Sequence, residues 1–112
     1  MPMIRIQTNQ TVTDSKVLLE KLSSSASLYT GKPEAYIMTA ITDGLAMIFA
    51  GTDEAAAFIE CKSIGLEESQ TKALSAWLCD FCEKELSIPK NRVYIEFASA
   101  RGSMWGWQGG TF

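Results

Sequence analysis

The stretch Pro33–Thr42 (PEAYIMTAIT) decides the fold, because it is the first of two similar passages. It follows a predicted helix, begins with a proline, and continues through Tyr-Ile into apolar and β-branched residues typical of a strand. A second passage, Pro89–Ala98 (PKNRVYIEFA), also follows a predicted helix and also continues through Tyr-Ile. The chain therefore contains a strand–helix–strand unit twice.

The remaining strands are predicted from alternation and turn signals. Residues 3–7 alternate apolar and polar side chains with the period of two typical of a half-buried strand. The dipeptide Asp43-Gly44 is a turn signal, and the apolar run that follows it is expected to form a further short strand. The expected strands cover Met3–Gln7, Ala35–Thr42, Leu45–Ala50, Ala55–Ile64 and Val93–Ala98.

Two helices are predicted from residues that recur at helical spacing. The first has Thr13 or Asp14 as N-cap and Gly31 as C-cap. The second begins beyond Glu67 and Glu68, which suit a helix N-terminus, and ends before Pro89. The apolar residues that mark these helices are Leu18, Leu22 and Tyr29 in the first, and Leu74, Trp77, Leu78, Phe81 and Cys82 in the second.

These elements predict one α+β domain over residues 1–112, with two pseudo-symmetric β-α-β units. Right-handed crossovers place both helices on one face of a four-stranded mixed sheet. The strand at residues 36–41 is apolar on both alternating sets, and no third helix exists to cover the far face. Because sheets with parallel pairs are rarely left open, we expect that face to pack against copies of the same chain in a closed cyclic oligomer.

Composition excludes several classes of protein. With 10 Lys and Arg against 13 Asp and Glu, the formal charge of −3 disfavours nucleic-acid binding. Apolar runs such as Leu45–Ala50 fall far short of the roughly 20 residues of a membrane span, and the N-terminus lacks the pattern of a signal peptide. We therefore expect a soluble, cytoplasmic protein that makes no contact with membranes or nucleic acids.

The three cysteines and the absence of histidine limit the available chemistry. Cys61, Cys79 and Cys82 cannot all pair within one chain, and no histidine is present to complete a four-ligand zinc site. Cys79 and Cys82 form a C-x-x-C pattern in the middle of a predicted helix, which favours core packing over a redox role. No metal or cofactor is expected, and an acid–base reaction would need a group other than histidine.

Pro2 is the first candidate for that group. Removal of Met1 would leave a free secondary amine, whose ordinary pKa lies near 8. Burial in an apolar pocket beside another cation lowers such a pKa, so that the neutral, basic form is present near neutrality. The alternative is that proline stands second in the chain through composition alone.

Several short motifs are spread along essentially the whole chain. They are Met1-Pro2-Met3-Ile4, Thr30-Gly31-Lys32-Pro33, Tyr36-Ile37, Ser63-Ile64-Gly65, Arg92-Val93-Tyr94-Ile95, Gly106-Trp107 and Thr111-Phe112. Each is weak alone, but in their order and spacing they resemble the macrophage migration inhibitory factor family of the tautomerase superfamily.

The resemblance implies a homotrimer in which three sheets form a central barrel, with a pocket at each subunit boundary. It implies a cofactor-free keto–enol tautomerase acting on phenylpyruvate-like acids, with dopachrome as a weaker substrate. By the resemblance, Pro2 would be the base and then the acid. Lys32 and the backbone N–H of Ile64 would bind the substrate carboxylate, and Tyr94 would reach in from the neighbouring chain.

The resemblance also implies the other pocket residues. Glu96 lies two residues after Tyr94, so both side chains share one face of a strand. Many relatives carry Asn at the position of Glu96, and a carboxylate there would repel an anionic group, which leaves substrate preference open. The remaining implied lining residues are Ser63, Tyr36, Met38, Phe97, Trp105, Trp107 and Phe112.

Two of these residues also have a purely structural interpretation. Lys32 could be an ordinary solvated lysine after a capping glycine, and Trp105 could belong to a tail that only covers the core.

Two rival functions remain open from the sequence. The first is a cytokine-like signalling or partner-binding protein with a vestigial pocket, secreted without a signal peptide and acting on an unknown receptor. The second is hydration or dehalogenation of an unsaturated acid, with Glu96 or Arg101 recruited to activate water or hold the substrate.

Overall fold

A mixed four-stranded sheet forms the centre of the computed structural model, which describes residues 1–112. Its strands lie in the order β2-β1-β3-β4. Within the sheet, β1 and β2 are parallel, β3 and β4 are parallel, and β1 and β3 run antiparallel in the middle. Each β-α-β unit thus contributes one parallel pair, as the sequence predicts. The strand bounds are Met3–Thr8 for β1, Met38–Thr42 for β2, Ala57–Ile64 for β3 and Val93–Ala100 for β4.

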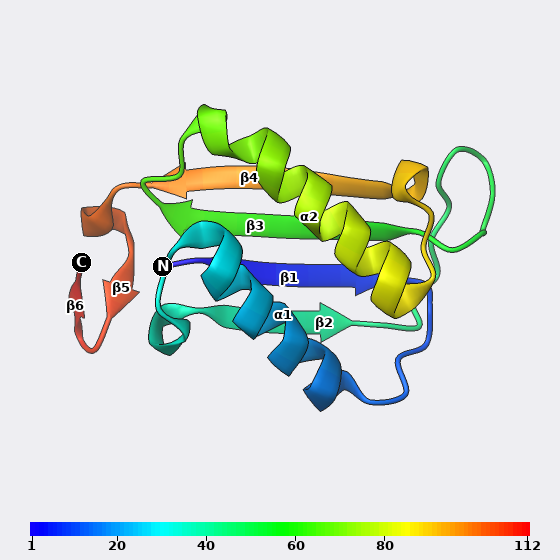
Figure 1. Cartoon of the computed structure of the whole chain (residues 1–112), viewed down its shortest axis with the longest axis horizontal. Helices are drawn as coiled ribbons and strands as arrows, with labels where there is room; N and C mark the ends of the chain where they lie inside the picture. Colours follow the sequence, from blue (N-terminus) through cyan, green and yellow to red (C-terminus); the bar gives the residue numbers. More distant parts are fainter.

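Two helices, α1 (Ser15–Thr30) and α2 (Glu68–Leu86), cross the same face of the sheet, as Figure 1 shows. The side chain of Asp14 accepts a hydrogen bond from the backbone N–H of Val17 at 3.1 Å and so caps α1. Gly31 ends α1 in the left-handed conformation, with a φ of 71°. Neither helix is both long and apolar enough to span a membrane.

Short elements connect these parts and close the chain. Three 3₁₀ turns cover Glu34–Tyr36, Lys90–Arg92 and Gly102–Met104. After β4, strands β5 (Gly106–Trp107) and β6 (Gly110–Thr111) form a C-terminal hairpin. This hairpin lies at the same end of the molecule as the N-terminus (Figure 1).

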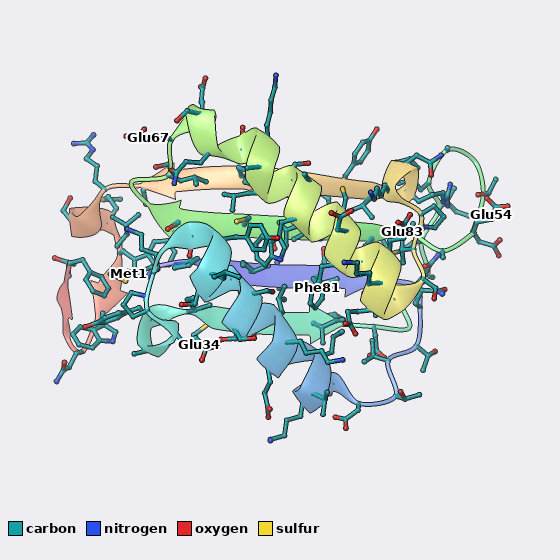
Figure 2. All side chains as sticks on the ribbon, viewed as in Figure 1. Met1, Glu34, Glu54, Glu67, Phe81 and Glu83 are labelled. Atoms are coloured by element: carbon teal, nitrogen blue, oxygen red, sulfur yellow. The ribbon has the colours of Figure 1, made fainter.

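The core lies between the helices and the sheet. The helix-facing residues of β1 and β3 alternate with partly exposed ones, which is the period of a half-buried sheet. Ile4, Ile6 and Ile59 are fully buried and pack in one cluster with Leu22 of α1 and Leu78 of α2. In Figure 2, Phe81 of α2 lies over the sheet in this layer.

Two predicted strands differ from the structure. Leu45–Ala50 is not a strand; it belongs to a loop whose only ladder contact is an isolated bridge between Phe49 and Thr52. The run is apolar enough for a strand, but it forms no ladder with a strand of this chain, and only the N–H of Leu45 donates to the end of β1, at the carbonyl of Thr8 (3.0 Å). The strand predicted from Ala35 begins only at Met38, because Glu34–Tyr36 forms a 3₁₀ turn.

The face of the sheet opposite the helices is uncovered in the chain, but it is less apolar than the sequence suggested. The cross-strand register places Arg5, Glu60 and Glu96 in one row on this face. The Nε of Arg5 donates to Glu60 at 2.7 Å, and this hydrogen bond lowers the pKa of the Glu60 carboxyl. Apolar Met38 and Tyr94 flank the row and are about two thirds exposed (63% and 65%).

Candidate active site

Pro2 lies at the start of β1, at the end of the sheet next to the C-terminal hairpin. Its side chain is fully buried. Its carbonyl accepts a hydrogen bond from the backbone N–H of Met38 at 3.0 Å, which fixes the first residues of the chain beside β2. The terminal amine of Met1 donates to the Oγ of Ser63 at 3.4 Å. The N-terminus is therefore held by β2 on one side and by β3 on the other.

A largely apolar cavity of about 280 Å³ opens on one side of Pro2. The C-terminal hairpin and the 3₁₀ turn before β2 supply its aromatic wall. The ring centroids of Trp107 and Phe112 are 5.4 Å apart, and Tyr36 meets both rings edge-on at 5.8 and 6.0 Å. Trp105 and Met38 line the same cavity. A wall of this kind suits a planar apolar group.

Pro2 also lines a smaller, more polar cavity of about 90 Å³, together with Lys32, Ser63 and Ile64, among others. Lys32 is half-buried and forms no ion pair within the chain. The turn at Gly31 places Lys32 here, and its carbonyl accepts a hydrogen bond from the Oγ of Ser27 at 2.6 Å. An unpaired cation beside a small polar cavity suits a carboxylate.

The electrostatic environment favours a neutral amine at this end of the chain. Burial lowers the pKa of the Met1 amine, and the positive charge of Lys32 lowers it further. Pro2 is buried more deeply than Met1 and lines both cavities. The same two causes would act on the amine of Pro2 once Met1 is removed.

Tyr94 and Glu96 lie far from Pro2 within the chain. In the register of the sheet, Tyr94 pairs with Phe58, whereas Met3 pairs with Lys62 at the other end of β3. Figure 2 shows the separation of the two ends: Met1 lies beside the C-terminal hairpin, and Glu54 lies in the loop at the opposite end. The chain alone thus brings together all but three of the expected site residues.

The third residue outside the site is Phe97. It faces the helices and packs against the core, so its side chain supports β4 from within. Tyr94 and Glu96, in contrast, are exposed on the uncovered face.

The cysteines of the C-x-x-C pattern lie within α2, far from its first turn. Burial raises the pKa of Cys82 to about 12 and also raises that of Cys79. Neither thiol is therefore set up to act as a thiolate near neutrality. No group of three or more His, Cys, Asp or Glu side chains converges in the chain.

Comparison with known proteins identifies the family of the chain. The full chain, residues 1–112, matches the sequence profile described as macrophage migration inhibitory factor (MIF). The chain belongs to the MIF family. It is 39% identical to the MIF homolog of Trichinella spiralis and 36% identical to MIF of Xenopus laevis, in each case over 100% of this chain and at least 99% of the relative.

Solved structures of MIF-family proteins share this fold. The MIF homologue from Prochlorococcus marinus is 41% identical and superposes with a TM-score of 0.93, covering 98% of each chain. The MIF structure from Trichinella spiralis superposes with a TM-score of 0.92 at 34% identity, covering 98% of this chain and 99% of its own.

The candidate site contains residues that the sequence did not predict. Cys61, Thr30 and Gln70 also line the small cavity. Cys61 could have been found, because it lies two residues before Ser63 on β3 and so shares its face. Gln70 gave no such signal: its side chain accepts from the backbone N–H of Glu67 at 2.9 Å and caps α2, and the cavity lies beside that cap.

Proposed function

We propose that the chain, once Met1 is removed, is a cofactor-free keto–enol tautomerase that acts on phenylpyruvate-like acids with Pro2 as its base. One observation carries the proposal: Pro2 is fully buried and lines both an aromatic cavity and a polar cavity whose lining includes an unpaired lysine. A substrate with a ring at one end and a carboxylate at the other matches these cavities, because the ring suits the aromatic cavity and the carboxylate suits the polar one. Its reacting carbon would lie between them, next to the amine.

The proposed reaction moves one proton. The neutral amine of Pro2 takes a proton from the carbon α to the carbonyl, and the C–H electron pair shifts to give an enolate. The protonated amine then returns this proton to the enolate oxygen, which gives the enol. Lys32 and the backbone N–H of Ile64 hold the carboxylate, while the aromatic wall keeps water from the amine.

We further propose that the active form is a homotrimer, in which Tyr94 and Glu96 of one chain complete the pocket of the next. Two features support this. Tyr94 is 65% exposed on the sheet face opposite the two helices. The apolar run Leu45–Phe49 also has no strand partner in the chain, as expected of a segment that pairs with another copy.

The experiment compares processed wild-type protein with Pro2→Gly, after intact mass has shown that Met1 is absent from both. Loss of the enol absorbance of phenylpyruvate in the ultraviolet measures the rate. We expect Pro2→Gly to lower kcat/KM by about 100-fold or more, since a positioned base contributes about that much. A form of the wild type that retains Met1 should be inactive, because its Pro2 nitrogen is an amide. Equal rates in wild type and Pro2→Gly would refute the assignment.

A second candidate, a cytokine-like partner-binding protein with a vestigial pocket, is favoured by a different observation. Met104, in the 3₁₀ turn before the hairpin, is 78% exposed, and Trp107 of the hairpin is 53% exposed. Such apolar exposure is typical of contact surfaces. A processed wild type that shows no turnover above Pro2→Gly would favour this candidate.

A further inference from the structure

Arg92 is a buried cation whose hydrogen-bond acceptors are all backbone carbonyls. It is 7% exposed and forms no ion pair with a carboxylate. Its guanidinium instead donates to four carbonyls of the loop before β3. The acceptors are Phe49 at 2.8 Å, Glu54 at 2.9 Å, Ala55 at 3.1 Å and Thr52 at 3.4 Å. Only the planar fork of arginine can serve so many acceptors at once.

The same arginine contacts the ring of Phe49, which in turn contacts Tyr94. The guanidinium carbon of Arg92 lies 5.1 Å from the centroid of the Phe49 ring. The ring centroids of Phe49 and Tyr94 are 4.6 Å apart, with the planes tilted by 40°. Since most of Tyr94 is exposed, this ring contact restricts a side chain that would otherwise be free to change rotamer.

We propose that Arg92 and Phe49 are positioning residues for the pocket of the neighbouring subunit, because they hold Tyr94 in the orientation that closes the ring end of the substrate. The inference rests on the proposed function, which places Tyr94 in that pocket. Neither residue touches substrate, so each acts on binding of the aryl group and leaves proton transfer at Pro2 unchanged.

The loop offers a matched control, because Asn9 also holds it but makes no hydrogen bond to Phe49. The Nδ2 of Asn9 donates to the carbonyls of Asp53 at 3.1 Å and Glu54 at 2.9 Å, and its Oδ1 accepts from the N–H of Ala56 at 2.9 Å. Asn9→Ala therefore loosens the same loop but leaves the contacts of Phe49 intact. A merely structural role of the loop would make all loop variants behave alike.

The first experiment measures kcat and KM of the processed wild type, Phe49→Leu, Arg92→Lys and Asn9→Ala. Exchange of α-protons for deuterium, followed by NMR, gives rates for phenylpyruvate and for 2-oxobutanoate, which has no ring. We expect Phe49→Leu and Arg92→Lys to raise KM for phenylpyruvate about fivefold, the size of one lost aromatic contact. Their kcat, and both constants for 2-oxobutanoate, should stay at the wild-type level.

Asn9→Ala should lower the thermal midpoint and leave KM for phenylpyruvate unchanged. If Arg92→Lys does not fold, Phe49→Leu decides. Equal effects of Phe49→Leu and Asn9→Ala on KM, equal effects on both substrates, or no effect of Phe49→Leu would each overturn the proposal.

A second experiment separates this inference from the proposed function. Binding of unreactive 3-phenylpropanoate is followed by tryptophan fluorescence, since Trp105 and Trp107 line the aromatic cavity. If the wild type shows no turnover, the proposed function fails, but about fivefold weaker binding by Phe49→Leu would still support the positioning role. Unchanged binding by Phe49→Leu would overturn it.

Discussion

At the scale of single residues, the proposed chemistry depends on how burial and charge act on one nitrogen. Both cavities meet at Pro2, and Lys32 is the cation that lowers the pKa of the terminal amine in addition to burial. A lowered amine pKa extends the neutral, active form to lower pH, because protonation removes the lone pair that the reaction uses. In the proposed mechanism, the charge of Lys32 would therefore serve both substrate binding and the protonation state of the base.

Lys32→Gln tests this double role. Removing the charge should raise the pKa of the Pro2 amine toward its ordinary value near 8, so the rising limb of kcat/KM against pH should move to higher pH. KM for phenylpyruvate should rise as well, because the carboxylate loses its cation. Lys32→Arg keeps the charge and should keep the limb near its wild-type position. A limb that stays in place in Lys32→Gln would show that Lys32 has no influence on the base.

At the scale of elements, the C-terminal hairpin depends on a glycine that leaves room for the end of the chain. A Cβ at Gly102 would lie 2.7 Å from the carbonyl oxygen of Phe112, so the backbone would have to move. Since Phe112 and Trp107 form part of the aromatic wall, the displacement should disturb the cavity.

We therefore expect Gly102→Ala to raise KM for phenylpyruvate about threefold to tenfold, which corresponds to about 1 kcal/mol, the lower end of overpacking costs of about 1–3 kcal/mol. Ser103→Ala is the control, because Ser103 is exposed in the same turn and should behave as wild type. Steady-state kinetics of both variants checks this. Equal KM values would mean that the hairpin adapts without affecting the pocket.

The elements also show what the sequence could and could not predict. Helix α1 was predictable because its capping signals are local: the sequence offered Thr13 or Asp14 as N-cap and Gly31 as C-cap, and the structure uses Asp14 and Gly31. The segment Leu45–Ala50 was not, because a strand requires a hydrogen-bonded neighbour and local composition cannot say whether one exists. The role of Arg92 was equally hidden, since its acceptors are backbone carbonyls that carry no sequence signal.

At the scale of the whole molecule, the chain divides the expected site between its two ends. Pro2 and Lys32 lie at one end of the sheet, and Tyr94 lies on the uncovered face toward the other. The sequence resemblance implied both groups of residues, but only the structure shows that the two groups lie apart within one chain. The uncovered face, with its row of Arg5 and Glu60, is then the side on which copies would meet.

Subunit mixing tests this division. Pro2→Gly chains lack the base but keep Tyr94, whereas Tyr94→Ala chains keep the base. After unfolding and refolding of an equal mixture, random assortment should give intact pairs in about a quarter of the sites of a trimer. Activity on phenylpyruvate at low concentration should therefore exceed the sum of the two separate variants. No recovery in trimers verified by sedimentation would contradict a site shared between chains.

The most direct test is a titration of the Pro2 nitrogen itself in the processed protein. ¹⁵N NMR on proline-labelled protein gives its pKa, and the pH dependence of kcat/KM gives the pKa of the base in the reaction. We predict that the two values agree and lie clearly below the ordinary value near 8. A nitrogen that titrates at the ordinary value, or whose pKa differs from that of the rate profile, would contradict the account.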